Sequence, residues 1–121
     1  VVLVHGVRQV NELAYHDYIT KELPQHEFLG EMVQKQLLYY PTVTREPFRN
    51  EGRQTELIQS GKLFDDLGEP PLDPATDRGM ICGSPAMLKE ISAMLNGFGF
   101  QISPHIGVAG DYVIERAFVE Q

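Results

Sequence analysis

Four short apolar runs, separated by stretches with helical periodicity, decide what this chain can fold into. They cover residues 1–5, 37–40, 79–82 and 111–119, of which the last alternates with polar residues near its end. The first three are followed by a glycine or a proline. The first two runs are continuous rather than alternating, which is typical of strands buried on both faces. Strands that alternate with helices form a parallel sheet with right-handed crossovers. The sequence therefore predicts one α/β domain, and 121 residues suffice for its core.

Three helices are expected between these strands. The first begins after the N-cap Asn11 and ends at Pro24, and the second is short and ends at Gly61. The third begins after the N-cap Ser84, with Pro85 at its first position. The apolar stripe of this third helix is formed by Met87, Leu88, Ile91, Met94 and Leu95.

Composition restricts the classes of partner. The apolar fraction of 42% and the charged fraction of 22% are ordinary for a soluble globular protein. There is no run of about 18 apolar residues, so no membrane span is expected. A net charge of −7 without a basic stripe disfavours nucleic acid. The single cysteine, Cys82, fits a reducing, cytoplasmic setting, and the four histidines lack metal-ligand spacing, so no metal is expected.

Arginines follow the first two strands, against this acidic background. Arg8 comes after the first strand, Arg45 after the second, and Arg53 at the start of the next helix. Ligands bind at the carboxyl ends of strands in open α/β sheets, and guanidinium groups bind phosphate oxygens bidentately. No acidic residue directly follows Gly6, as one would in an NAD site. The pattern favours the 2′-phosphate of NADP; the alternative is three solvated charges in unrelated ion pairs.

The turn after the third strand is a second candidate site. Backbone amides at a helix start bind anions, and Gly83 lets a ligand approach the backbone closely. Cys82 could be a nucleophile there, because a helix start favours a thiolate. A cysteine-phosphatase loop would need an arginine, however, and residues 83–88 contain none. The other interpretation of Cys82 is a small residue packed at a strand end.

Four stretches carry a resemblance to a known family. They are residues 5–9 (HGVRQ), 39–46 (YYPTVTRE), 80–87 (MICGSPAM) and 110–120 (GDYVIERAFVE). In this order they resemble the carboxyl-terminal, NADP-binding half of bacterial flavin-dependent ferredoxin–NADP⁺ reductases, over essentially the whole chain. The resemblance implies an open parallel sheet with helices on both faces, in which residues 1–121 are the NADP-binding domain. The first strand of that domain and the flavin-binding barrel of the family are missing from this chain.

The resemblance assigns one group of residues to NADP. Arg8, Arg45 and Arg53 would hold the 2′-phosphate and the adenosine end of the dinucleotide. Val7 and Thr44 would line the same site by their position in the matching motifs.

A second group is assigned to the nicotinamide and the flavin. Cys82 would lie beside the nicotinamide ring, and Glu115 matches the acidic catalytic residue of the family. In the tail, residues 115–121, Ala117 and Phe118 would contact FAD, and Phe118 offers a ring for stacking. The turn itself would contribute cofactor-binding residues, namely Gly83, Ser84, Pro85 and Met87.

The function implied by the resemblance is electron transfer between NADPH, FAD and ferredoxin or flavodoxin in the cytoplasm. The protein would position the nicotinamide against the flavin, while the cofactors carry the chemistry. The missing strand and flavin domain are expected to belong to the same natural polypeptide, because unpaired strand edges disfavour independent folding. The alternatives are a related NADPH–flavin reductase that serves an oxygenase, and a non-catalytic nucleotide-binding or assembly domain.

Overall fold

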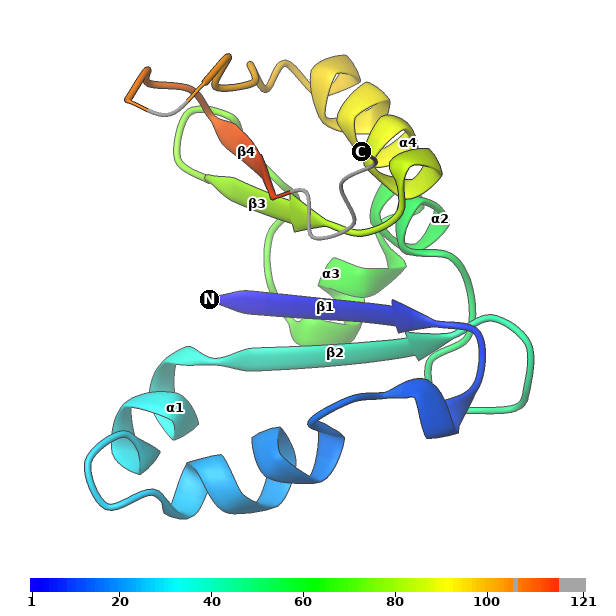
Figure 1. Ribbon diagram of the computed structural model, residues 1–121, viewed down its shortest axis with the longest axis vertical. Helices are drawn as coiled ribbons and strands as arrows, with labels where there is room; N and C mark the ends of the chain where they lie inside the picture. Colours follow the sequence, from blue (N-terminus) through cyan, green and yellow to red (C-terminus); the bar gives the residue numbers. More distant parts are fainter. Residues whose placement is uncertain (106, 116–121) are drawn as a thin grey trace, which may run out of the picture. The chain divides into compact units, whose positions relative to one another are not determined.

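The computed structural model describes residues 1–105 and 107–115, which belong to two compact units, one formed by Val1–Gly68 and the other by the residues from Glu69 onward. In both units strands and helices alternate along the chain (Figure 1). The first unit contains β1 (Val2–Val7), α1 (Gly30–Gln36), β2 (Leu38–Val43), α2 (Gln54–Gln59) and α3 (Lys62–Leu67). The second unit contains β3 (Gly79–Cys82), α4 (Pro85–Gly97) and β4 (Tyr112–Glu115).

Both units are built on a pair of parallel strands. β1 pairs with β2 from Val2 opposite Leu38 to Val7 opposite Val43. β3 pairs with β4 over four residues, and the last pair is Cys82 opposite Glu115. The α/β class and the parallel pairing predicted from the sequence are confirmed. Among the described residues the sheet consists of these two separate pairs rather than one continuous sheet.

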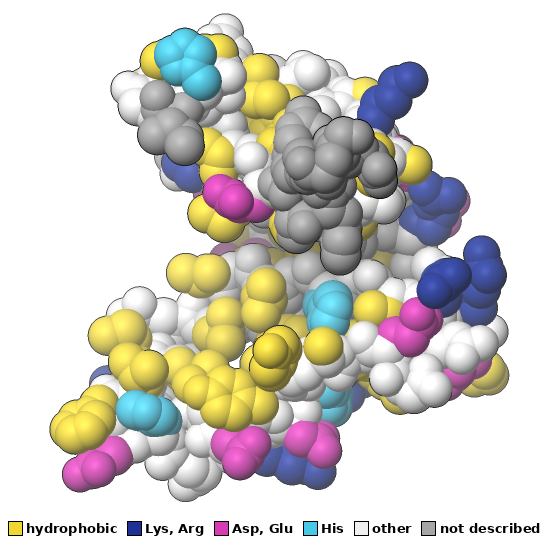
Figure 2. All heavy atoms as spheres, in the orientation of Figure 1, with side chains coloured by type: hydrophobic (Ala, Val, Ile, Leu, Met, Phe, Trp, Pro, Cys, Tyr) yellow, Lys and Arg dark blue, Asp and Glu magenta, His cyan; other side chains and the backbone are white. Residues whose placement is uncertain are grey.

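The expectation that β1 is buried on both faces is wrong. Val2 and Leu3 are 39% and 40% exposed. Among the described residues β1 also pairs with β2 alone, so that one of its edges is unpaired. In Figure 2, apolar side chains lie open over β1 and the segment that leads to α1. β2 differs, since its last residues Pro41, Thr42 and Val43 are all fully buried. The core of the first unit therefore lies on β2.

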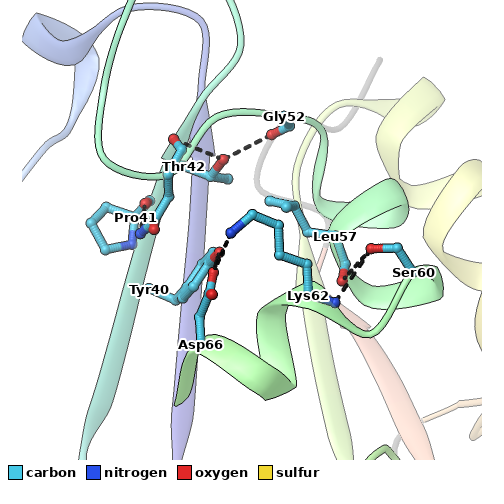
Figure 3. A network of polar contacts seen from close by, with 9 residues as sticks. Tyr40, Pro41, Thr42, Gly52, Leu57, Ser60, Lys62 and Asp66 are labelled. Carbon is cyan, nitrogen blue, oxygen red and sulfur yellow. Dashed lines mark hydrogen bonds and ion pairs between the residues drawn. The ribbon is translucent and has the colours of Figure 1, made fainter. Parts of the chain in front are cut away.

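Helical segments cover both faces of β2, as the resemblance implies. Neighbouring residues of a strand point to opposite faces. The ring centroid of Tyr39 lies 6.0 Å from that of His16, in the helical segment before α1. The hydroxyl of Tyr40 donates to Oδ2 of Asp66 on α3 at 2.6 Å, and Nζ of Lys62 donates to the same oxygen at 2.8 Å (Figure 3).

The Tyr40–Asp66 hydrogen bond predicts a specific pH dependence of stability. Burial, together with Asp66, raises the pKa of the Tyr40 hydroxyl well above its usual range. Hydrogen bonds from Lys62 and Tyr40 lower the pKa of the Asp66 carboxyl. A lowered carboxyl pKa stabilises the fold above about pH 4, and this contribution disappears as the pH falls through the lowered value. A raised tyrosine pKa stabilises the fold below about pH 10.

We therefore expect Tyr40→Phe to lower the free energy of unfolding by the same amount throughout about pH 5–9, and by less below about pH 4. Urea unfolding at several pH values measures this difference. The exposed Tyr18→Phe substitution is the control and should show no loss at any pH. A loss at Tyr40 that changes between pH 5 and 9 would contradict the assignment.

The first predicted helix is interrupted in the structure. Residues 10–12 form a 3₁₀ turn capped by Gln9 rather than Asn11, and Tyr18–Glu22 is a π-helix. Tyr15 adopts a φ of 62°, a left-handed conformation that a right-handed helix does not contain. Pro41 does not end the second strand either, because β2 continues to Val43 and has no partner strand besides β1 among the described residues.

In the second unit, the third strand and the start of the next helix are as expected. The last strand is described over Tyr112–Glu115; Asp111 precedes it, and residues 116–119 of the expected strand lie outside the described residues. β3 has the predicted bounds, and α4 starts after the predicted N-cap, Ser84. Tyr112 of β4 is buried, and its hydroxyl donates to Oδ1 of Asn96 on α4 at 2.7 Å. The apolar side of α4 buries Leu88, Ile91, Met94 and Leu95. None of the helices among the described residues has the length and apolar character that crossing a bilayer requires.

Candidate functional site

The first two predicted arginines, Arg8 and Arg45, lie on neighbouring segments that continue from the carboxyl ends of β1 and β2. Beyond the last ladder pair, the N–H of Thr44 donates to the carbonyl of Val7 at 3.1 Å. The N–H of Arg45 then donates to the carbonyl of Arg8 at 2.8 Å. Four residues that the sequence places at one site therefore continue the strand pairing at one edge of the first unit.

A close contact between β1 and α2 places the start of α2, which follows the third arginine in sequence, next to β1. Gly6 lies against the side chain of Gln54, the first residue of α2, so that a Cβ at position 6 would come within 2.6 Å of Nε2 and 3.0 Å of Cγ. Arg53 is the residue before Gln54 and the N-cap of α2. α2 has only six residues, so guanidinium charge rather than the helix dipole must supply most of the attraction for an anion.

Arg8 is held in place but remains open to solvent. Its Nη2 lies 3.1 Å from Oε2 of Glu12, and the arginine side chain is 64% exposed. The other carboxylate oxygen of Glu12 accepts the N–H of Gln9 at 2.9 Å. The hydrogen bonds from Gln9 and Arg8 lower the pKa of Glu12, so this ion pair persists at mildly acidic pH. Figure 2 shows Lys and Arg side chains beyond the ends of β1 and β2, where an anion could approach from solvent.

The loop between Arg45 and Arg53 has its own internal contacts. The guanidinium of Arg49 lies over the ring of Phe48, 5.1 Å from its centroid. The N–H of Phe48 donates to Oε1 of Glu51 at 3.2 Å. Arg49 therefore stacks on its neighbour, which gives this loop a defined shape.

In the second unit, the strand register brings the predicted catalytic pair together. Cys82 and Glu115 are the last pair of the β3–β4 ladder. Residues paired in a parallel sheet point to the same face, so a thiol and a carboxylate lie side by side at the carboxyl end of this strand pair. Cys82 is exposed, and its interpretation as a residue packed at a strand end is therefore wrong.

Met87 packs against the turn that follows Cys82. The N–H of Met87 donates to Oγ of Ser84 at 3.2 Å, and Pro85 is the first residue of α4. Met87 Sδ lies so close to Gly83 that a Cβ there would collide with it. The predicted residues of this turn thus form one compact surface next to Cys82.

Two predicted flavin contacts, Ala117 and Phe118, lie outside the described residues. Within the described ranges, no three His, Cys, Asp or Glu side chains are placed to hold a metal ion. Sequence reasoning missed Thr42 and Asn50, which anchor the loop that carries the arginines. The sequence alone does not single out these two residues, because threonines in strands and asparagines in polar loops are common.

Parallel strands that alternate with helices make this an α/β fold, the class in which ligands bind outside the carboxyl ends of the strands. The chain shares its fold with a crystal structure of a ferredoxin NADP⁺ reductase from Neisseria gonorrhoeae with bound FAD and NADP. The TM-score is 0.77 and the sequence identity 24%, over 97% of this chain and 44% of that chain. The fold is therefore part of the reductase fold.

Proteins with similar sequences are also named ferredoxin–NADP reductases. The whole chain is 65% identical to a ferredoxin–NADP reductase of Pseudomonas aeruginosa and 64% identical to one of Azotobacter vinelandii, and it covers 47% of each. It is 40% identical over 119 residues to a flavodoxin/ferredoxin–NADP reductase of Rhodobacter capsulatus, of which it covers 44%. No protein-family model matches the chain. The resemblance to ferredoxin–NADP reductases is confirmed along the whole chain, which spans about half the length of these relatives.

Proposed function

We propose that this chain is the NADP(H)-binding part of a ferredoxin–NADP⁺ reductase. The observation that supports the proposal is the main-chain hydrogen bond between Arg8 and Arg45 at the carboxyl ends of β1 and β2. Arg53 precedes Gln54, whose side chain lies against Gly6 of β1. Planar guanidinium groups suit a dianionic phosphate ester, and the 2′-phosphate distinguishes NADP from NAD. The names of relatives at 64–65% identity support the same activity.

Each unit carries its own group of proposed contacts with the nucleotide. The arginine edge would bind the 2′-phosphate, with Val7 and Thr44 beside it. The second unit would receive the nicotinamide next to Cys82 and Glu115, on the surface formed by Gly83, Ser84, Pro85 and Met87. Cys82 and Glu115 are the residues to which we assign the catalytic roles, because the strand register pairs them at an exposed strand end.

FAD, when bound, supplies hydride acceptance and one-electron transfer. The residues of this chain hold and orient the NADP(H), which needs close approach of the reacting rings rather than acid–base catalysis. In this proposal residues 1–121 are the NADP-binding domain, the tail (residues 115–121) contacts FAD, and most of the FAD site lies in sequence outside this chain. Within the tail, Ala117 and Phe118 are the proposed contacts.

The proposed electron partner is a ferredoxin or a flavodoxin, as in the names of the relatives. The proposed location is the cytoplasm, which the single cysteine fits. The net charge of −7 disfavours this chain as the main docking surface for an acidic ferredoxin. That surface is expected on the FAD domain.

The test uses the full-length natural polypeptide that contains this chain. It should be yellow from bound flavin and should oxidise NADPH with ferricyanide as acceptor, with a lower KM for NADPH than for NADH. Reduction of a ferredoxin or flavodoxin in the same assay identifies the partner. A colourless protein that is inert with both nucleotides would contradict the proposal and leave a binding or assembly domain.

A further inference from the structure

The loop that carries the arginines returns to β2 before α2 begins. The N–H of Val43 donates to the carbonyl of Asn50 at 3.1 Å, and the N–H of Gly52 donates to the carbonyl of Val43 at 3.2 Å. Val43 and Glu51 thereby form an isolated parallel bridge. Arg45 follows the end of β2, before residues 50–52 return to the strand, and Arg53 comes directly after these residues. The geometry of the return therefore sets where these two arginines stand relative to each other.

The buried Thr42 and the half-buried Asn50 anchor the return segment, residues 50–52, through their side chains. The hydroxyl of Thr42 is shared between the carbonyl of Gly52, at 2.8 Å, and that of Asn50, at 3.3 Å (Figure 3). The side-chain amide of Asn50 donates to the carbonyl of Pro41 at 2.9 Å. The return segment is thus held to β2 by side-chain as well as main-chain hydrogen bonds.

The Thr42 hydroxyl is not required by the strand. Thr42 has no exposed surface, and a fully buried strand position is most simply occupied by an apolar β-branched residue such as the adjacent Val43. Valine has nearly the shape of threonine but lacks the hydroxyl. The single hydroxyl proton is shared between two carbonyls of the return segment, with the shorter distance to Gly52, so its contribution is to the loop.

We propose that Thr42 and Asn50 are positioning residues that determine specificity for the 2′-phosphorylated nucleotide. This inference rests on the proposed function. Thr42 and Asn50 fix the distance between Arg45 and Arg53 before the ligand arrives. A loop that must be ordered on binding loses affinity to conformational entropy, and a loop fixed in advance does not. Loss of either anchor weakens the interaction with the phosphate and leaves the rest of the nucleotide site unchanged.

The experiment compares Thr42→Val with Thr42→Ser in the full-length protein. Thr42→Val should raise KM for NADPH about 3- to 10-fold, which corresponds to one hydrogen bond. KM for NADH and both kcat values should stay as in the wild type, and the inhibition constant of 2′-AMP should rise with the KM for NADPH. Thr42→Ser, which keeps the hydroxyl, should behave as the wild type. A purely structural role would change both nucleotides alike.

Unchanged discrimination between NADPH and NADH in Thr42→Val, or an equal rise of both KM values, would overturn the inference. If Thr42→Val does not fold, Asn50→Ala is measured instead, and its KM values for NADPH and NADH are judged in the same way. This substitution removes the side-chain amide that donates to the carbonyl of Pro41, at a half-buried position. If the wild-type protein has reductase activity and a clear preference for NADPH, the proposed function stands even when the variants overturn the inference. A wild type without that preference overturns the inference together with the phosphate assignment.

Discussion

Replacement of both Arg45 and Arg53 by alanine is expected to reduce the preference for NADPH over NADH by roughly 30- to 1,000-fold in kcat/KM. This factor corresponds to about 2–4 kcal/mol, since a hydrogen bond to a charged group contributes about 1.5–3 kcal/mol and water screens an exposed site. Arg45 follows the end of β2, and Arg53 precedes Gln54, whose side chain lies against Gly6 of β1. Steady-state kinetics with the two nucleotides on the full-length protein measure the change.

Two controls separate phosphate recognition from general effects of charge. Arg45→Lys keeps the charge but loses the bidentate geometry, so it should give an intermediate preference. Arg78→Ala removes an exposed arginine of the second unit, whose Nη1 donates to the carbonyl of Pro74 at 2.9 Å, and should leave the preference unchanged. A double Arg45/Arg53 variant that still discriminates as the wild type does would show that these arginines do not bind the 2′-phosphate.

Leu63→Ala is expected to lower the free energy of unfolding by about 2–5 kcal/mol, the range for a leucine removed from a packed core. Leu63 lies on α3 and is only 1% exposed. Its removal leaves a cavity in the core of the first unit. Urea unfolding of the full-length protein measures the loss.

Leu63→Met nearly conserves the volume and should cost less than about 1.5 kcal/mol. Leu67→Ala, at the less buried end of the same helix, should cost less than Leu63→Ala. A loss below about 1 kcal/mol at Leu63 would mean that α3 does not contribute to the core in the way its burial indicates.

Local chemistry made part of the fold predictable. The third strand ends at a glycine, and the serine and proline that follow are favourable at the N-cap and at the first position of a helix. The structure accordingly places β3 and the start of α4 where the sequence predicts them. Gly61 likewise ends α2 with a left-handed φ of 83°. Each of these features depends on a few adjacent residues.

Features that depend on tertiary contacts were not predictable. α1 and α3 have seven and six residues, too few for intrinsic helix stability, and α3 depends on contacts such as the Tyr40–Asp66 hydrogen bond. The apolar spacing of residues 15–23 matches an α-helix, but the left-handed conformation of Tyr15 interrupts it. The roles of Thr42 and Asn50 arise only once the return segment lies against β2.

The most direct test is a crystal structure of the full-length protein with NADP⁺ bound. We predict guanidinium nitrogens of Arg8, Arg45 and Arg53 about 2.7–2.9 Å from oxygens of the 2′-phosphate, with the nicotinamide near Cys82. A 2′-phosphate bound away from the ends of β1 and β2, with these arginines turned toward separate surroundings, would contradict it.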